Sequence, residues 1–137
     1  MAKTWNQKLD PPNHKPAVEI MDKAWGGVPA GGKLFIPTPR LVAEYIGKIP
    51  RGQAKTVPEM RAELAAEWKA DGTCPMTSGM FVRIAAEAAL EDMAGGKKVD
   101  QITPFWRIVD PKSPVIKKLS CGPEFVLARR AEEGLPV

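Results

Sequence analysis

Apolar residues recur with helical spacing in four stretches of the chain, and this spacing predicts four helices. The stretches comprise residues 38–46, 56–68, 77–94 and 124–133. Thr38, Thr56 and either Thr77 or Ser78 stand where a hydroxyl can accept a backbone N–H of a first helical turn. Each of the first three helices is therefore expected to begin at its own side-chain cap.

The third stretch carries two apolar stripes rather than one. Phe81 begins one stripe and Ala86 begins the other, and both continue at helical spacing. We therefore expect this helix to be buried on two sides and to end at Gly95-Gly96.

The first 37 residues have weaker patterns. Residues 1–16 are rich in Lys, Asn and Pro and predict a flexible or loosely docked arm. Val18–Trp25 is expected to form a short helix that ends at Gly26-Gly27, whereas the apolar run at 34–36 is too short to assign. The chain is thus divided into an arm with a short helix, residues 1–37, and a domain, residues 38–137.

An apolar and aromatic segment, residues 102–109, lies between the third and last helices. A turn rich in Pro follows it, and Val115-Ile116 is expected to pair back as a small hairpin. The expected fold is mainly α with a small β hairpin. Two helices joined by a turn and followed by a hairpin suit a winged helix-turn-helix, although periodicity alone is compatible with other small helical folds.

Composition narrows the class of protein. The 137 residues are enough for about one domain, and a hydrophobic fraction of 44% supports one core. No apolar run is long enough to cross a membrane and Met1–Asp10 lacks a signal pattern, so we expect no membrane contact and a cytoplasmic location. Cys74 and Cys121 lack CxxC spacing and His14 is the single histidine, so neither a metal site nor a disulfide is expected. We also expect no cofactor and a monomer.

The formal net charge is +4, and the excess of basic over acidic residues lies in residues 1–57. Such an excess attracts nucleic-acid phosphates, but it also serves solubility. Charge alone therefore does not identify a partner.

Two segments carry a family resemblance. The first runs from Tyr45 to Val57 and includes Ile49-Pro50-Arg51-Gly52, and the second is Ile102–Val109. Together they resemble the basic turn and the active-site strand of the O6-alkylguanine-DNA alkyltransferases and the alkyltransferase-like proteins. Gly122 and Glu133-Gly134 stand where that family has a glycine-containing binding loop and the end of its closing helix. The resemblance covers about residues 38–135 and implies a winged helix-turn-helix that binds duplex DNA.

The departures from the family bear on chemistry. In the transferases a cysteine thiolate, activated by an adjacent histidine, accepts the alkyl group. Here Phe105 stands at the cysteine position and Trp106 at the histidine position, and neither side chain can perform that role. Val57 replaces a tyrosine that helps to rotate the target nucleotide in the family, and Lys97 lies near the position of its intercalating arginine.

The alkyltransferase-like proteins also lack the cysteine and bind alkylated guanine without repairing it. The resemblance therefore implies a non-enzymatic DNA-binding protein that recognises O6-alkylguanine or distorted DNA and passes the site to excision repair proteins. Three alternatives remain: a general or sequence-reading DNA binder without a lesion pocket, an enzyme that uses Cys121 as the alkyl acceptor, and an interaction module that does not bind DNA.

Candidate site residues follow from the helix starts, the basic turn and the resemblance. The expected DNA contacts are Arg51, Lys55, Thr77, Ser78, Arg83, Lys97 and Lys98. The expected base pocket comprises Pro104, Phe105, Trp106, Arg107, Cys121 and Gly122.

Each candidate also has a plainer interpretation. Thr77 and Ser78 can simply cap a helix, the basic residues can be solvated surface, and Phe105 and Trp106 can be core. Arg107 is a charge inside an apolar run and needs a partner, for which Glu133 is the expected residue.

Overall fold

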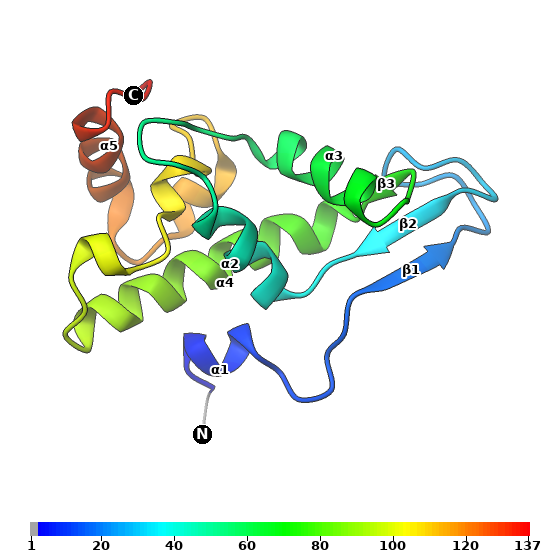
Figure 1. Cartoon of the computed structure of the whole chain (residues 1–137), viewed down its shortest axis with the longest axis horizontal. Coiled ribbons are helices and arrows are strands. Elements are labelled where there is room, and N and C mark those ends of the chain that lie inside the picture. The colour runs from blue at the N-terminus through cyan, green and yellow to red at the C-terminus, as the bar shows by residue number, and fades with distance from the viewer. Residues whose placement is uncertain (1–2) are drawn as a thin grey trace.

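A long central helix organises the fold. The computed structural model describes residues 3–137, in which helix α4 (Pro75–Ala94) contacts the helices α1 (Trp5–Leu9), α2 (Pro39–Gly47) and α3 (Val57–Glu67) (Figure 1). It also contacts two 3-10 helices, η2 (Phe105–Arg107) and η3 (Pro114–Lys118). The last helix, α5 (Gly122–Glu132), packs on η2 and η3. The molecule is mainly helical, as the apolar spacing predicts.

Capping residues explain where two of the helices begin. The hydroxyls of Thr38 and Thr56 accept the N–H of Leu41 and of Glu59, and Thr56 with Glu59 forms a complete capping box. The start of α4 differs from the prediction, because Pro75 opens the helix after Cys74 with no side-chain cap. A proline at the first position needs no N–H acceptor, so the helix begins without a hydroxyl cap.

The prediction that α4 is buried on two sides is confirmed. Phe81, Val82 and residues 85–89 are buried, and the helix ends at Gly95. Only its first turns and its last residue are exposed to solvent. The middle of α4 is therefore part of the core.

A small sheet lies beside α3 and the start of α4 (Figure 1). It consists of β1 (Ala17–Ile20), β2 (Lys33–Ile36) and β3 (Gly72–Thr73) in that order, with β1 antiparallel and β3 parallel to β2. The predicted helix at Val18–Trp25 is wrong. Its first residues pair with β2, and Gly26-Gly27, both at positive φ, form the tip of a tight turn instead of ending a helix.

The predicted hairpin at residues 102–116 is also wrong. The segment contains the 3-10 helices η1 (Val99–Gln101), η2 and η3 instead of strands. Phe105, Trp106, Ile108 and Val109 are all buried, whereas a strand with one solvent face would alternate buried and exposed positions. Pro104, Pro111 and Pro114 also lack the N–H groups that a strand ladder needs.

The N-terminal arm is docked on the core. Helix α1 packs against α4, and the side-chain amide of Asn6 donates to the carboxylate of Glu91 over 2.8 Å. Leu9 is buried in the main core. No helix among residues 3–137 is both long and apolar enough to span a membrane. The boundary at residue 37 remains a prediction. Strands β2 and β3 come from opposite sides of it and share one sheet.

Candidate functional site

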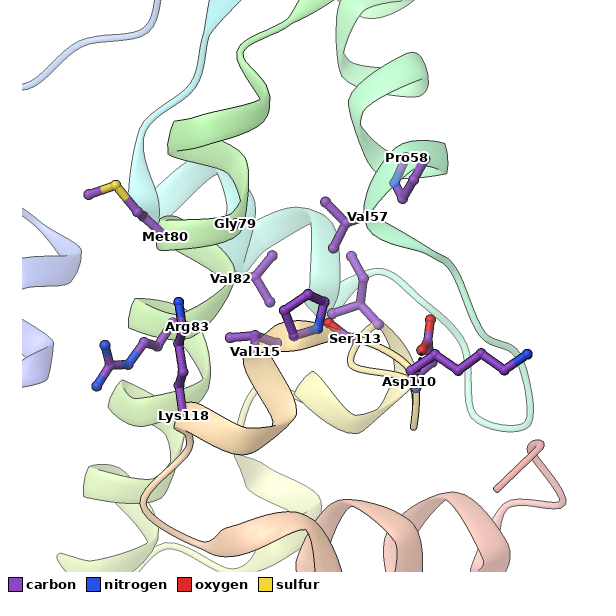
Figure 2. A pocket seen from close by; sticks show the side chains of 13 residues that line it. Val57, Pro58, Gly79, Met80, Val82, Arg83, Asp110, Ser113, Val115 and Lys118 are labelled. Atoms are coloured by element: carbon purple, nitrogen blue, oxygen red, sulfur yellow. Dashed lines mark hydrogen bonds between the residues drawn. The ribbon is translucent and has the colours of Figure 1, made fainter. Parts of the chain in front are cut away.

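An apolar cavity opens between α3, α4 and the segment 108–118, and we name it the α3–α4 cavity (Figure 2). Its volume is about 420 Å³, which lies in the range of small-ligand sites. The apolar lining residues are Val57, Pro58, Met80, Val82, Ile108, Pro114 and Val115, and Gly79 completes the wall on α4. The cavity therefore offers a ligand mainly aliphatic surface.

The charged lining of this cavity is predominantly basic. Arg83, Lys112 and Lys118 line it together with a single carboxylate, that of Asp110. None of the three cations forms an ion pair within 4 Å among residues 3–137. Asp110 accepts the backbone N–H of Lys112 over 2.7 Å and so stabilises its own turn. The cavity can therefore accommodate an apolar group with an anionic neighbour.

Arg83 has an unusual environment. Its Nε is buried and has no hydrogen-bond acceptor among the described residues. Figure 2 shows Arg83 and Lys118 on one side of the cavity and Asp110 on the other. A buried donor without an acceptor is costly, so this guanidinium is suited to gain an anionic partner.

Local structure explains how the lining is assembled. The capping box at Thr56 fixes the first turn of α3, which carries Val57 and Pro58 to the cavity. Val82 and Ile108 are fully buried and form part of the core beneath it. Val57 and Arg83 are the lining residues that the sequence singles out; the others are brought together only by tertiary packing.

The predicted base pocket does not form as one site. Phe105 is fully buried, stacks on Phe125 with 5.8 Å between ring centroids, and lines neither this cavity nor the next. Its assignment to a pocket wall is wrong, since a side chain enclosed on all sides cannot contact a base. Trp106 is also core, but it lines a second cavity together with Pro104 and Arg107.

We name this second hollow the Glu133 cavity, and its volume is about 730 Å³. The Glu133 carboxylate accepts hydrogen bonds from Arg107 Nε (2.9 Å), Trp106 Nε1 (2.6 Å) and the backbone N–H of Gly52 (3.0 Å). Arg107 also donates to the carbonyl of Ile49 over 2.8 Å. The expected pairing of Arg107 with Glu133 is confirmed.

The charge of Glu133 is strongly stabilised. Burial alone would raise the pKa of its carboxyl group, but the hydrogen bonds from Arg107, Gly52 and Trp106 outweigh burial and lower the pKa to about 2. The group is ionised at neutral pH and holds three segments together. Its role is therefore structural.

Cys121 and Gly122 lie at the start of α5 and line neither cavity. Burial raises the pKa of the Cys121 thiol, and the charges of Glu87 and Glu124 act in the same direction. A thiol with a raised pKa is a poor nucleophile at neutral pH. Gly122 has a φ of 75°, a left-handed conformation that suits glycine.

The predicted DNA contacts fall in different environments. Ser78 is fully buried and donates to the carbonyl of Cys74 over 2.7 Å, so its assignment as a DNA contact is wrong. Thr77 is half-buried, and its hydroxyl is enclosed without a hydrogen-bond partner among residues 3–137. Lys55 pairs with Glu63 over 3.0 Å.

The remaining basic candidates lie elsewhere. Lys97 is 3.9 Å from Asp92 at the end of α4. Arg51 and Lys98 line the Glu133 cavity, and Arg83 alone of the predicted DNA contacts lines the α3–α4 cavity. The set predicted from sequence is thus spread over several surfaces.

Among residues 3–137 no group of three or more His, Cys, Asp or Glu side chains is placed to hold a metal ion. No protein-family model matches the chain, and neither a curated protein nor a solved structure gives a match. The function is therefore inferred from the geometry of the two cavities and the charges around them.

Proposed function

We propose that the protein binds duplex DNA without reacting with it, and that the α3–α4 cavity receives a base turned out of the helix. The observation that carries the proposal is an aliphatic cavity whose three cations have no ion pair among the described residues. Aliphatic walls can pack on a base, and cations beside them can contact the phosphates that flank it. Neither feature requires a reactive group.

The aliphatic lining supports a preference for alkylated guanine. An O6-alkyl group adds apolar surface to the base, and Val57, Pro58 and Pro114, which are half-buried or exposed, offer apolar surface in return. Val57 also stands at the position that acts on the target nucleotide in the alkyltransferase family, which supports the same location for the base. In this proposal the bound lesion is then passed to excision repair proteins.

The burial of α4 determines how DNA would dock. In the proposed arrangement, α3 and α4 act as a helix-turn-helix pair in which 3-10 helices take the place of a hairpin wing after α4, and only the first turns of α4 meet the duplex. Met76 and Met80 are the exposed large side chains there, with exposed fractions of 64% and 55%. Large apolar side chains at such a place can act as a wedge between base pairs.

Two observations favour binding over alkyl transfer. Phe105 has no nucleophilic atom and is enclosed in the core. Cys121 has a thiol of raised pKa and lines neither cavity.

The test compares matched duplexes with and without one O6-methylguanine, by fluorescence anisotropy at several salt concentrations. The informative variant is Gly79→Leu, because a Cβ at Gly79 meets no atom within 4 Å and the residue lines the cavity. Filling the cavity should weaken binding of the modified duplex about tenfold, on the order of one lost base contact. The added side chain should not destabilise α4, since Gly is a poor helix former.

Gly47→Leu is the matched control. Gly47 lines the Glu133 cavity and its Cβ position is equally open, so this variant should bind both duplexes as the unmodified protein does. Weak binding of both duplexes without salt dependence would exclude DNA as the ligand. If binding depends on salt but Gly79→Leu does not change it, the protein is a general DNA binder, and the cavity is not the site of the base.

A further inference from the structure

Glu91 on α4 anchors the first turn of the N-terminal arm. The carboxylate of Glu91 accepts the backbone N–H of Trp5 over 3.0 Å and that of Asn6 over 3.1 Å. A capping box between Thr4 and Gln7 starts the short helix. These contacts set the position of the Trp5 ring relative to α4.

The Trp5 ring gathers two cations. Lys8 Nζ lies 4.2 Å from the ring centroid, and Arg83 Cζ lies 5.4 Å from it. Both distances are within the range of cation–π attraction. Arg83 also lines the α3–α4 cavity, so the tryptophan connects the arm to that cavity.

A third cation lies on the same side. Lys118 lines the α3–α4 cavity, and Figure 2 shows it on the side of Arg83. Figure 2 also shows the guanidinium of Arg83 pointing away from the valines of the cavity and toward the N-terminal part of the chain. Arg83 and Lys118 thus belong both to the cavity wall and to the cationic cluster, which extends from the cavity to the arm.

The neighbouring acidic groups are already engaged. Glu91 accepts hydrogen bonds from Trp5 and Asn6, and Asp92 accepts one from Asn6 and lies near Lys97. Among residues 3–137, neither Lys8, Arg83 nor Lys118 forms an ion pair. Three like charges without counterions favour an anionic ligand.

We propose that Lys8, Arg83 and Lys118 form a phosphate site, and that Trp5 is the positioning residue that holds Arg83 in it. The inference rests on the proposed function, because the ligand is the DNA phosphate beside the base in the α3–α4 cavity. The N-terminal arm is then part of the binding surface rather than an accessory to the fold.

The test is a double-mutant cycle measured by anisotropy on duplex DNA over a range of salt concentrations. Arg83→Gln should weaken binding about tenfold, as expected for loss of one charge-assisted contact. The logarithm of the association constant falls linearly with the logarithm of the salt concentration, and Arg83→Gln should make this slope less steep by about 0.9. Trp5→Leu should weaken binding in the unmodified protein and have a clearly smaller effect in the Arg83→Gln background, because only its contact with Lys8 then remains.

Two control variants accompany the cycle. Trp5→Phe keeps an aromatic face and should retain most of the affinity. Lys3→Gln removes a charge from an exposed position on the same arm and should leave the salt slope nearly unchanged. Thermal melting of each variant checks that the arm remains docked.

The outcomes separate the two proposals. Absence of salt-dependent binding by the unmodified protein would overturn both. Salt-dependent binding that Arg83→Gln leaves unchanged would overturn the phosphate site alone. Additive losses from Trp5→Leu and Arg83→Gln would overturn the positioning role of Trp5.

Discussion

Arg107 and Glu133 form a largely buried ion pair, with 2.9 Å between Nε and Oε1. Their side chains are 14% and 3% exposed, and the pair joins η2 to the end of α5. Through Ile49 and Gly52 the same pair also fixes the loop before α3. Three segments distant in sequence thus depend on one carboxylate.

Glu133→Gln should destabilise the protein by about 3 kcal/mol, because it leaves the Arg107 charge poorly compensated in a buried place. Urea denaturation at pH 7 measures the free energy of unfolding. Glu132→Gln is the control, since Glu132 pairs with Arg129 but is half exposed, and its loss should cost under about 1 kcal/mol. Equal losses for the two variants would contradict the structural role of Glu133.

The same carboxylate predicts a pH dependence. Its pKa falls from 4.5 to about 2 on folding, so the unfolded state binds its proton first as the pH decreases. The contribution of the ionised Glu133 carboxylate to the free energy of unfolding is complete above about pH 5 and is lost as the pH falls from there through 2. The stability difference between the unmodified protein and Glu133→Gln should therefore shrink over this interval in urea melts. A constant difference down to pH 2 would argue against the lowered pKa.

Two threonines with similar sequence context should behave differently. Thr56→Ala removes a capping box and should cost about 1 kcal/mol. Thr77→Ala should cost much less, because α4 begins at Pro75 and the Thr77 hydroxyl has no hydrogen-bond partner in the described part of the chain. Thermal denaturation of both variants under one condition makes the comparison. A larger loss at Thr77 would show that this hydroxyl has a partner in solution.

Cys121 should react slowly. Its thiol has a pKa above the ordinary 9.0, so its iodoacetamide reaction in the Cys74→Ala background should be slower at pH 8 than that of free cysteine. Intact mass should also stay constant after incubation with O6-methylguanine DNA. A mass increase of one methyl group would support the alternative in which the protein is a transferase that uses Cys121 as the alkyl acceptor.

Local chemistry explains which parts of the fold were predictable. The helices at residues 38–46 and 56–68 have hydroxyl caps and regular apolar spacing, and both signals lie within a few residues. The double stripe of α4 likewise predicts its burial. The pairing of Arg107 with Glu133 is predictable as well, because a charge in an apolar run needs a partner.

The remaining features depend on distant parts of the chain. Val18, Met21 and Trp25 have helical spacing, yet residues 17–20 pair with β2, an edge that periodicity cannot reveal. Phe105–Val109 contains nearly continuous apolar residues, which fit a buried 3-10 turn as well as a strand. The α3–α4 cavity joins Val57 to Val115 by tertiary packing alone, and Trp5 reaches Arg83 only because Glu91 anchors the arm.

The enclosure of Phe105 limits what substitution at this position can achieve. Phe105→Cys would exchange a stacked ring for a small side chain and leave a void beside Phe125. The new sulfur would face packed hydrocarbon, at a position that does not line the α3–α4 cavity. A single exchange at residue 105 would thus yield a weakened protein and no alkyl acceptor.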